Sequence, residues 1–193
     1  PDRKDQAVLF NSLHFLIFLP LLVGIYYTIP HRFRWILIFI GSCYFYMVFV
    51  PKYILVLFLI IIIDYIAGLT IEQVRGRLKL FYLVLSLGAN IGLLAFFKYF
   101  AFLNENLVWL LSLFGKDFHG YHLNVILPIG LSFHTFQSMS YTIEVYRGKQ
   151  KAERHLGYFA NYVLFFPQMV AGPIERYDSL GNALKTEVKP LYD

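Results

Sequence analysis

The chain has 193 residues, of which 58% are hydrophobic, 19% are aromatic and only 15% are charged. Soluble domains carry about a quarter charged residues, so this composition excludes an ordinary soluble globule and predicts a chain that lives in a lipid bilayer. The net charge of +5 comes from Lys and Arg in the loops between apolar runs. We therefore expect these residues to set the orientation of the membrane spans, and we expect no nucleic-acid partner.

Four apolar runs open the chain, at residues 13–29, 35–50, 53–69 and 80–97. At a rise of ~1.5 Å per residue, each is long enough, or nearly so, to cross a hydrocarbon core ~30 Å thick. The first run continues past Pro20 without a small-residue cleavage site, so we expect it to stay in the mature protein. The fourth is expected to cross once, with Lys98 near its outer end and residues 104–114 forming an interfacial or re-entrant piece.

Basic residues are concentrated in alternate loops, which indicates the orientation of the spans. If the fourth run crosses the membrane once, all the loops rich in Lys and Arg lie on the same side of the membrane. The positive-inside rule identifies that side as the cytoplasm. The N-terminus and residues 116–124 are then expected outside. The basic residues in question are Arg32 and Arg34, then Arg75, Arg77 and Lys79, then Arg147, Lys149, Lys151 and Arg154.

The fifth expected span, residues 125–146, carries a polar stripe made of His134, Gln137, Tyr141 and Glu144. On a helix that advances ~100° per residue these four side chains share one face, while Phe136, Met139 and Ile143 fall on the opposite side. Unpaired polar groups cost several kcal/mol in hydrocarbon, so the stripe is expected to face the bundle interior. It either lines a polar path or joins helices together.

The next apolar run, residues 158–170, is too short to cross a membrane and is stopped by Ala171, Gly172 and Pro173. Broken backbone is tolerated at membrane depth only against protein or a cavity, so this run is expected beside the polar stripe as a half-helix or re-entrant segment. The predicted fold class is therefore all-α: a polytopic transmembrane helical bundle with a short re-entrant or half-helix near the C-terminus.

The titratable groups assemble no catalytic motif, because the chain has no GxSxG elbow, P-loop or dinucleotide fingerprint. His134 is either a general base or a hydrogen-bonded structural histidine. Glu144 is expected to pair with Arg147, one turn further on.

The other intramembrane acid, Asp64, is expected to pair within the bundle, with Lys98 or Arg75. The single cysteine, Cys43, excludes an intrachain disulfide, and His119 and His122 have no third ligand, so no metal site is expected.

Two blocks, LPIGLSFHTFQSMSYTIEVYRGK and ANYVLFFPQMVAGPIERYDSL, resemble the membrane-bound O-acyltransferase family in its alginate O-acetyltransferase-like branch. VLFNSLHFLIFLPLLVGIYY, DYIAGL and LLAFFKYFAFLNENL add to the resemblance, which covers residues 8–180. It implies a bundle with a central tunnel in the bacterial inner membrane. Through this tunnel an acyl group, most simply acetyl, passes from acyl-CoA or an acyl carrier protein to a hydroxyl of a cell-envelope polysaccharide. An accessory envelope acetyltransferase and a cytoplasmic acyl carrier are the implied partners.

The resemblance also implies that residues 1–193 are the N-terminal part of a single domain, truncated after 193, whose catalytic histidine lies beyond this chain. No catalytic residue and no bound cofactor are therefore assigned here. His134 departs from the aromatic residue that the family usually has at its position. The tunnel-side positions carried over are Ser132, Phe133, Gln137, Tyr141, Gln168 and Arg176, with Pro128, Gly130, Pro167, Gly172 and Pro173 as framework; the polar stripe adds His134 and Glu144 to the substrate-channel candidates.

Two other interpretations remain open. A non-catalytic transporter or channel would also need a polar span along its permeation path, although transporters often have repeated halves and no internal repeat is found here. The chain could also be an inactive fragment of a membrane protein.

Overall fold

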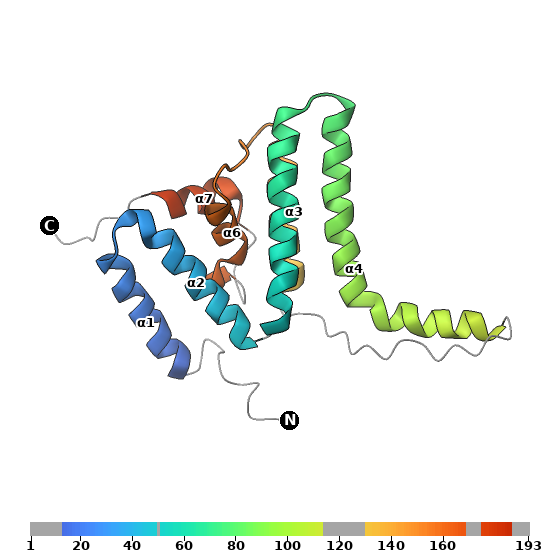
Figure 1. Cartoon of the computed structure of the whole chain (residues 1–193), viewed down its shortest axis with the longest axis horizontal. Helices are drawn as coiled ribbons and strands as arrows, with labels where there is room; N and C mark the ends of the chain where they lie inside the picture. Colours follow the sequence, from blue (N-terminus) through green and yellow to red (C-terminus); the bar gives the residue numbers. More distant parts are fainter. Residues whose placement is uncertain (1–12, 50, 114–129, 169–174, 187–193) are drawn as a thin grey trace.

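The computed structural model describes residues 13–49, 51–113, 130–168 and 175–186, and every regular element among them is helical (Figure 1). The all-α part of the predicted fold class is therefore confirmed. The elements are α1 (Leu13–Thr28), α2 (His31–Phe49), η1 (Pro51–Tyr53), α3 (Ile54–Gln73), α4 (Arg77–Leu113), α5 (Leu131–Tyr146), α6 (Leu156–Leu164), η2 (Phe166–Gln168) and α7 (Tyr177–Lys185).

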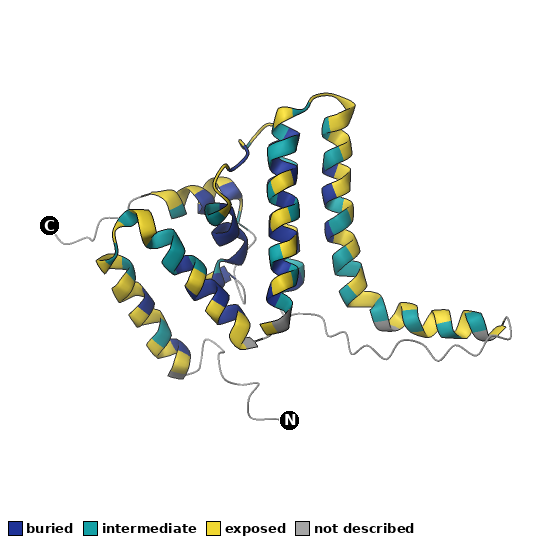
Figure 2. Ribbon diagram, viewed as in Figure 1, coloured by how far each residue is buried: buried dark blue, intermediate teal, exposed yellow. Residues whose placement is uncertain are grey.

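Two groups of helices build the molecule. The long helices α3 and α4 run antiparallel, side by side, and α5 packs against both of them. Helices α1, α2, α6 and α7 gather on the other side of α3 (Figure 1). The nine-residue α6 lies at the centre, in contact with α2, α3, α5 and α7, and residues 159–164 are all buried (Figure 2).

Two helices among the described residues, α3 and the Arg77–Phe100 part of α4, are long and apolar enough to cross a membrane. Helix α1 is a shorter apolar helix. Large apolar side chains such as Leu55 on α3 and Leu85 on α4 are more than half exposed, as lipid contact requires. Length and composition thus support two of the expected crossings, and the others stay a proposal.

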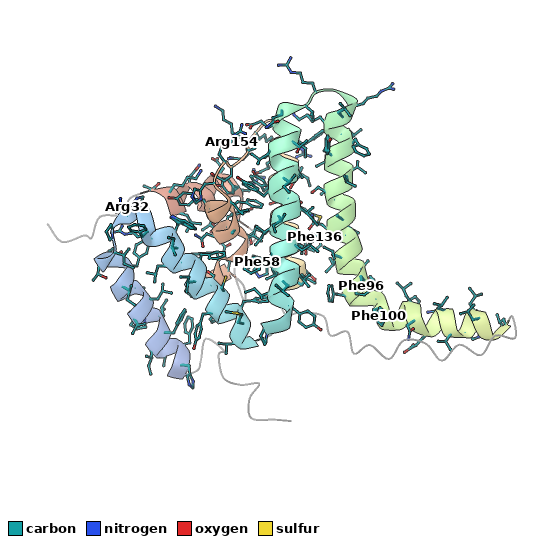
Figure 3. All side chains as sticks on the ribbon, viewed as in Figure 1. Arg32, Phe58, Phe96, Phe100, Phe136 and Arg154 are labelled. Atoms are coloured by element: carbon teal, nitrogen blue, oxygen red, sulfur yellow. The ribbon has the colours of Figure 1, made fainter. Side chains whose placement is uncertain are left out.

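Helix α4 differs from the expected single span followed by a separate interfacial piece. It is one continuous helix of 37 residues that includes residues 104–113. It bends near Phe96 and Phe100, and its last turns project away from the rest of the molecule (Figures 1 and 3). The expected piece is therefore the end of α4 turned sideways.

Burial on α5 extends beyond the polar stripe. His134, Gln137 and Tyr141 are buried as expected, and Phe136 on the other side is 49% exposed. Met139, however, is also buried. The reason is that α3, α4 and α6 together cover more than one face of α5, so its polar and apolar sides are both packed.

Helices α3 and α5 approach closely at Gly68. A Cβ atom at this position would lie 2.9 Å from Cε1 and from the hydroxyl of Tyr141. The Tyr141 ring has no freedom to withdraw, because it is fully buried and its hydroxyl accepts a hydrogen bond from the Glu153 amide at 2.8 Å. Glycine is therefore required here by packing.

We expect Gly68→Ala to lower the free energy of unfolding by about 1–3 kcal/mol, the usual cost of overpacking. Gly88→Ala on α4 is the matched control, since a Cβ there meets nothing within 4 Å and alanine favours helix. Thermal unfolding of both variants in detergent measures the difference. Equal melting temperatures for the two would contradict the close contact.

Candidate functional site

The polar stripe of α5 binds the interrupted end of α6. His134 Nδ1 donates to the carbonyl of Val163 at 2.6 Å, and Gln137 Nε2 donates to the carbonyl of Tyr162 at 2.8 Å. These carbonyls belong to the last turn of α6, where intrahelical donors are missing. Pro167 follows closely and cannot continue the helix ladder. Side chains of α5 thus replace the absent backbone donors.

Gln137 also connects α5 to the segment after α6. Its Nε2 lies 3.2 Å from Oε1 of Gln168 in η2, so one amide bridges α6 and η2. On the opposite flank, Asn161 Nδ2 donates to the carbonyl of Trp35 at 2.7 Å, which ties α6 to α2. The short run is therefore held on two sides by buried hydrogen bonds. The expected contact between the stripe and this run is present, while Gly172 and Pro173 lie outside the described residues.

Glu144 and Arg176, two of the predicted channel residues, form an ion pair with each other. Nε of Arg176 lies 3.4 Å from Oε1 of Glu144. The predicted partner of Glu144, Arg147, is therefore wrong: sequence proximity suggested it, but the chain returns and brings Arg176 to the same place. Since the Arg176 side chain is 73% exposed, this pair marks an accessible edge of the stripe.

Glu153, which no sequence pattern singled out, joins three segments of the chain, its own loop, α5 and α7, in what we call the Glu153 clamp. Its carboxylate accepts hydrogen bonds from the Tyr177 hydroxyl and from Nζ of Lys185 on α7. Its own amide donates to the hydroxyl of Tyr141 on α5. The only signal in the sequence is one acid inside an otherwise basic loop, which ordinarily means a solvated side chain.

The electrostatics of the Glu153 clamp favour the charged form of the acid. Burial of the Glu153 carboxyl raises its pKa, but the hydrogen bonds from Lys185 and Tyr177 outweigh burial, so the pKa lies below its ordinary value of 4.5. The same contact, after burial, raises the pKa of the Tyr177 hydroxyl, which therefore stays protonated and able to donate.

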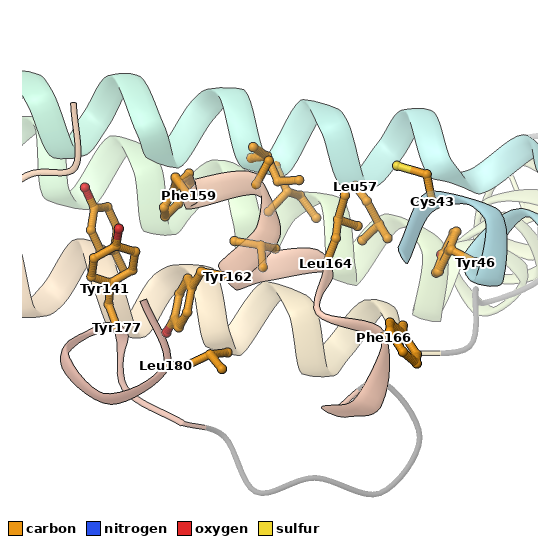
Figure 4. Close-up of a cluster of buried hydrophobic side chains, with 14 of the residues drawn as sticks. Cys43, Tyr46, Leu57, Tyr141, Phe159, Tyr162, Leu164, Phe166, Tyr177 and Leu180 are labelled. Atoms are coloured by element: carbon orange, nitrogen blue, oxygen red, sulfur yellow. The ribbon is translucent and has the colours of Figure 1, made fainter. Parts of the chain in front are cut away.

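An aromatic cluster fills the space beneath the Glu153 clamp (Figure 4). The ring centroids of Tyr141 and Phe159 are 4.6 Å apart, and those of Tyr162 and Tyr177 are 4.9 Å apart. All four rings are fully buried. Such pairs contribute about 0.5–1.5 kcal/mol each beyond their buried area, so the cluster fixes α6 and α7 against α5.

The loop between α5 and α6 is held over the end of α3. Both carboxylate oxygens of Glu72 are engaged, one by the guanidinium of Arg154 and the other by the amide of Ala152 at 3.2 Å (Figure 3). The hydroxyl of Tyr65 donates to the carbonyl of Arg154 at 2.7 Å. The last part of the basic loop is therefore fixed to α3, with Ala152 and Glu153 buried.

Asp64 does not pair with Lys98 or Arg75, as the sequence suggested. Its Oδ1 accepts hydrogen bonds from the Ser86 hydroxyl and, at 2.8 Å, from Nδ2 of Asn90, both on α4. The predicted pairing within the bundle is thus present, but with neutral partners. Helical spacing between Ser86 and Asn90 places both on the face that meets α3.

The predicted channel residues separate into two sets. His134, Gln137, Tyr141 and Gln168 are buried, whereas Ser132, Glu144 and Arg176 are partly or fully exposed. Gly130 precedes α5 with a φ of 79°, a left-handed conformation that favours glycine, and Pro167 lies exposed in η2. Pro128 lies outside the described residues.

Two crevices of about 650 Å³ and 630 Å³ lie elsewhere, between α1 and α2 and between α2, α3 and α6, and contain none of the predicted channel side chains. Within the described parts of the chain, no group of three His, Cys, Asp or Glu side chains could hold a metal ion. His119 and His122 lie outside those parts. The described site is thus an interlocked polar scaffold with one accessible, charged edge.

Curated relatives extend over most of this chain. It is 37% identical to a Pseudomonas aeruginosa protein named "Probable alginate O-acetylase AlgI" over 177 residues, which are 90% of this chain and 34% of the relative. It is 36% identical to the Pseudomonas putida protein of the same name over 188 residues, 95% of this chain and 38% of the relative. A "Peptidoglycan O-acetyltransferase" of Helicobacter pylori is 32% identical over 168 residues, 73% of this chain and 31% of the relative.

These relatives confirm the resemblance inferred from the sequence motifs, to the alginate O-acetyltransferase-like branch of the membrane-bound O-acyltransferases. The chain spans about a third of the length of the curated relatives that it matches. No family model and no solved structure matches the chain.

The Glu153 clamp predicts a pH dependence of stability. Because the folded-state pKa of Glu153 is lowered, its contribution is complete above the unfolded-state pKa near 4.5 and is lost as the pH falls through the folded-state value. We expect Glu153→Gln to lower the free energy of unfolding by about 1–3 kcal/mol at pH 7. We also expect its stability to fall less steeply than that of the unaltered protein as the pH is lowered. Thermal unfolding between pH 3 and 7 measures this, with exposed Glu105→Gln as the control. If Glu153→Gln loses stability at low pH as steeply as the unaltered protein, Glu153 does not cause this pH dependence.

Proposed function

We propose that this protein is part of an O-acetyltransferase that transfers an acetyl group onto a hydroxyl of a cell-envelope polysaccharide. The observation that carries the proposal is the similarity to alginate O-acetylases and to a peptidoglycan O-acetyltransferase over 73–95% of the chain. Both named acceptors are polysaccharides. The relatives' names favour this reading over the transporter or channel alternative.

The arrangement of α5, α6 and η2 supports two different roles for the proposed channel residues. The buried set, His134, Gln137, Tyr141 and Gln168, holds the broken helix in place. Glu144 and Arg176 form the accessible edge, where polar or anionic parts of a substrate would meet them, and Ser132 is partly exposed near the other end of α5. A rigid wall of this kind contributes orientation, which is a large part of the barrier in group transfer between two substrates.

The donor in this proposal is a thioester, either acyl-CoA or an acylated carrier protein. Transfer forms one ester bond, breaks one thioester bond, and moves the hydroxyl proton to the departing thiolate. This step needs a base, which the resemblance places beyond residue 193. An accessory envelope acetyltransferase and a cytoplasmic acyl carrier belong to the same proposal.

The proposed location is the bacterial inner membrane, crossed several times. The two apolar helices support this, together with the basic loops that the positive-inside rule places in the cytoplasm. Residues 1–193 are proposed to be the N-terminal part of the transferase domain.

Gln137→Leu is expected to reduce acetyl transfer more than tenfold in the complete enzyme, because the Tyr162 carbonyl and the Gln168 amide lose a shared donor in a buried site. Met139→Leu, a buried and nearly volume-conserving change two residues away, is the matched control and should leave transfer within twofold. Membranes incubated with labelled acetyl donor and polysaccharide give the ester-linked label. Absence of any acetyl transfer by the unaltered enzyme would contradict the proposed function itself.

His134→Asn is expected to keep acetyl transfer within about fivefold of the unaltered enzyme. The amide of asparagine can replace the Nδ1–H donor to Val163, whereas it cannot act as a general base, and loss of such a base costs about 10²–10⁴-fold. His134→Leu, which loses the donor, should impair folding and transfer together. A hundredfold loss in a well-folded His134→Asn protein would make His134 catalytic and overturn the structural role given to it here.

A further inference from the structure

The interface of α3, α4 and α5 contains a second polar group of residues, separate from the polar stripe and from the Glu153 clamp. Asp64 on α3 is fully buried there, near the middle of an apolar helix. Ser86 and Asn90 approach it from α4, and the hydroxyls of Ser138 and Thr142 face it from α5. We call these five residues the Asp64 cluster.

The hydrogen bonds of the Asp64 cluster leave several oxygen atoms without donors. Asp64 Oδ1 takes both the Ser86 and the Asn90 donors, while Asp64 Oδ2, Asn90 Oδ1 and Ser138 Oγ are buried and have no hydrogen-bond partner among the described residues. The Asn90 amide cannot be reversed to help, because Nδ2 faces two acceptors, Asp64 Oδ1 at 2.8 Å and the Ser86 carbonyl at 3.0 Å. Two of the three atoms can only accept.

A charge on Asp64 would also be uncompensated within the cluster. The ion pairs among the described residues use Glu72, Glu144 and Glu153, and none of them involves Asp64. A carboxylate taken out of water without a cation is very costly, because the interior screens charge poorly. These atoms are buried where α3, α4 and α5 pack together, so a group that compensates them has to be small.

We propose that the Asp64 cluster binds a small monovalent cation, for which Na⁺ is the probe. The ligands are Asp64 Oδ2, Asn90 Oδ1, Ser138 Oγ and Thr142 Oγ1, whose own proton is committed to the Ser138 carbonyl at 3.3 Å. An all-oxygen donor set selects a hard cation, and a single carboxylate balances a single positive charge. A proton on Oδ2 would need only one acceptor, whereas buried oxygens without a partner lie on all three helices, α3, α4 and α5.

The cation in this proposal fastens α3, α4 and α5 together and so supports the two apolar helices on which α5 rests. It does not depend on the proposed acetyl transfer. The test needs neither donor nor acceptor, so failure of this proposal and failure of the proposed function give different results.

The experiment compares thermal unfolding of the purified protein in detergent with NaCl or choline chloride at equal ionic strength. We expect NaCl at about ten times the dissociation constant to raise the melting temperature by about 3 °C or more, because the cation binds only the folded protein. Asp64→Asn and, separately, Ser138→Ala should abolish the difference. Ser140→Ala, on the same helix with its hydroxyl bonded to the Gln137 carbonyl, should retain it.

Binding of radioactive ²²Na⁺ to the unaltered protein gives a second readout that does not require unfolding, and Asp64→Asn should lose it. The proposal is overturned if the unaltered protein binds no ²²Na⁺ and melts at the same temperature in both salts. An Asp64→Asn variant that is as stable as the unaltered protein, with no effect of Na⁺ on either, would assign a proton to Asp64 Oδ2 in place of the cation. Retention of the Na⁺ effect in Asp64→Asn would place the ion elsewhere.

Discussion

The rest of the structure depends on the hydrogen bonds that α5 makes to the last turn of α6. A nine-residue helix that ends in the middle of a packed, apolar molecule leaves carbonyl groups with no backbone donor. In this environment each unsatisfied group costs about 1–3 kcal/mol or more. His134 and Gln137 supply the donors, so the polar stripe and the broken helix require each other.

Two further anchors hold the segments on either side of α6. The Glu153 clamp secures α7, and the contacts of Glu72 with Arg154 and Ala152 secure the preceding loop on the end of α3. Each anchor uses a carboxylate that several donors share, and charge-assisted bonds of this kind are about twice as strong as neutral ones. The polar interior is therefore built from a few acids, each with several partners.

This design explains why a stripe that looks like a channel lining is largely packed against protein. The donors that a permeation path would offer to a substrate are, for His134 and Gln137, already committed to the backbone of α6. Only Glu144 and Arg176 remain near solvent at the edge of the stripe. The same residue types serve both purposes, and only their partners in space distinguish a scaffold from a path.

The sequence by itself determined the helical class, the apolar runs that become α1 to α4, the short broken helix and the buried face of α5. These follow from local periodicity and composition, which fix where a helix forms and which face avoids lipid. Tertiary structure alone decided the partners: Arg176 for Glu144, Ser86 and Asn90 for Asp64, and the burial of Glu153. Such pairings join residues 22 to 32 positions apart. No local pattern specifies them, because they depend on how the chain returns past itself after each turn.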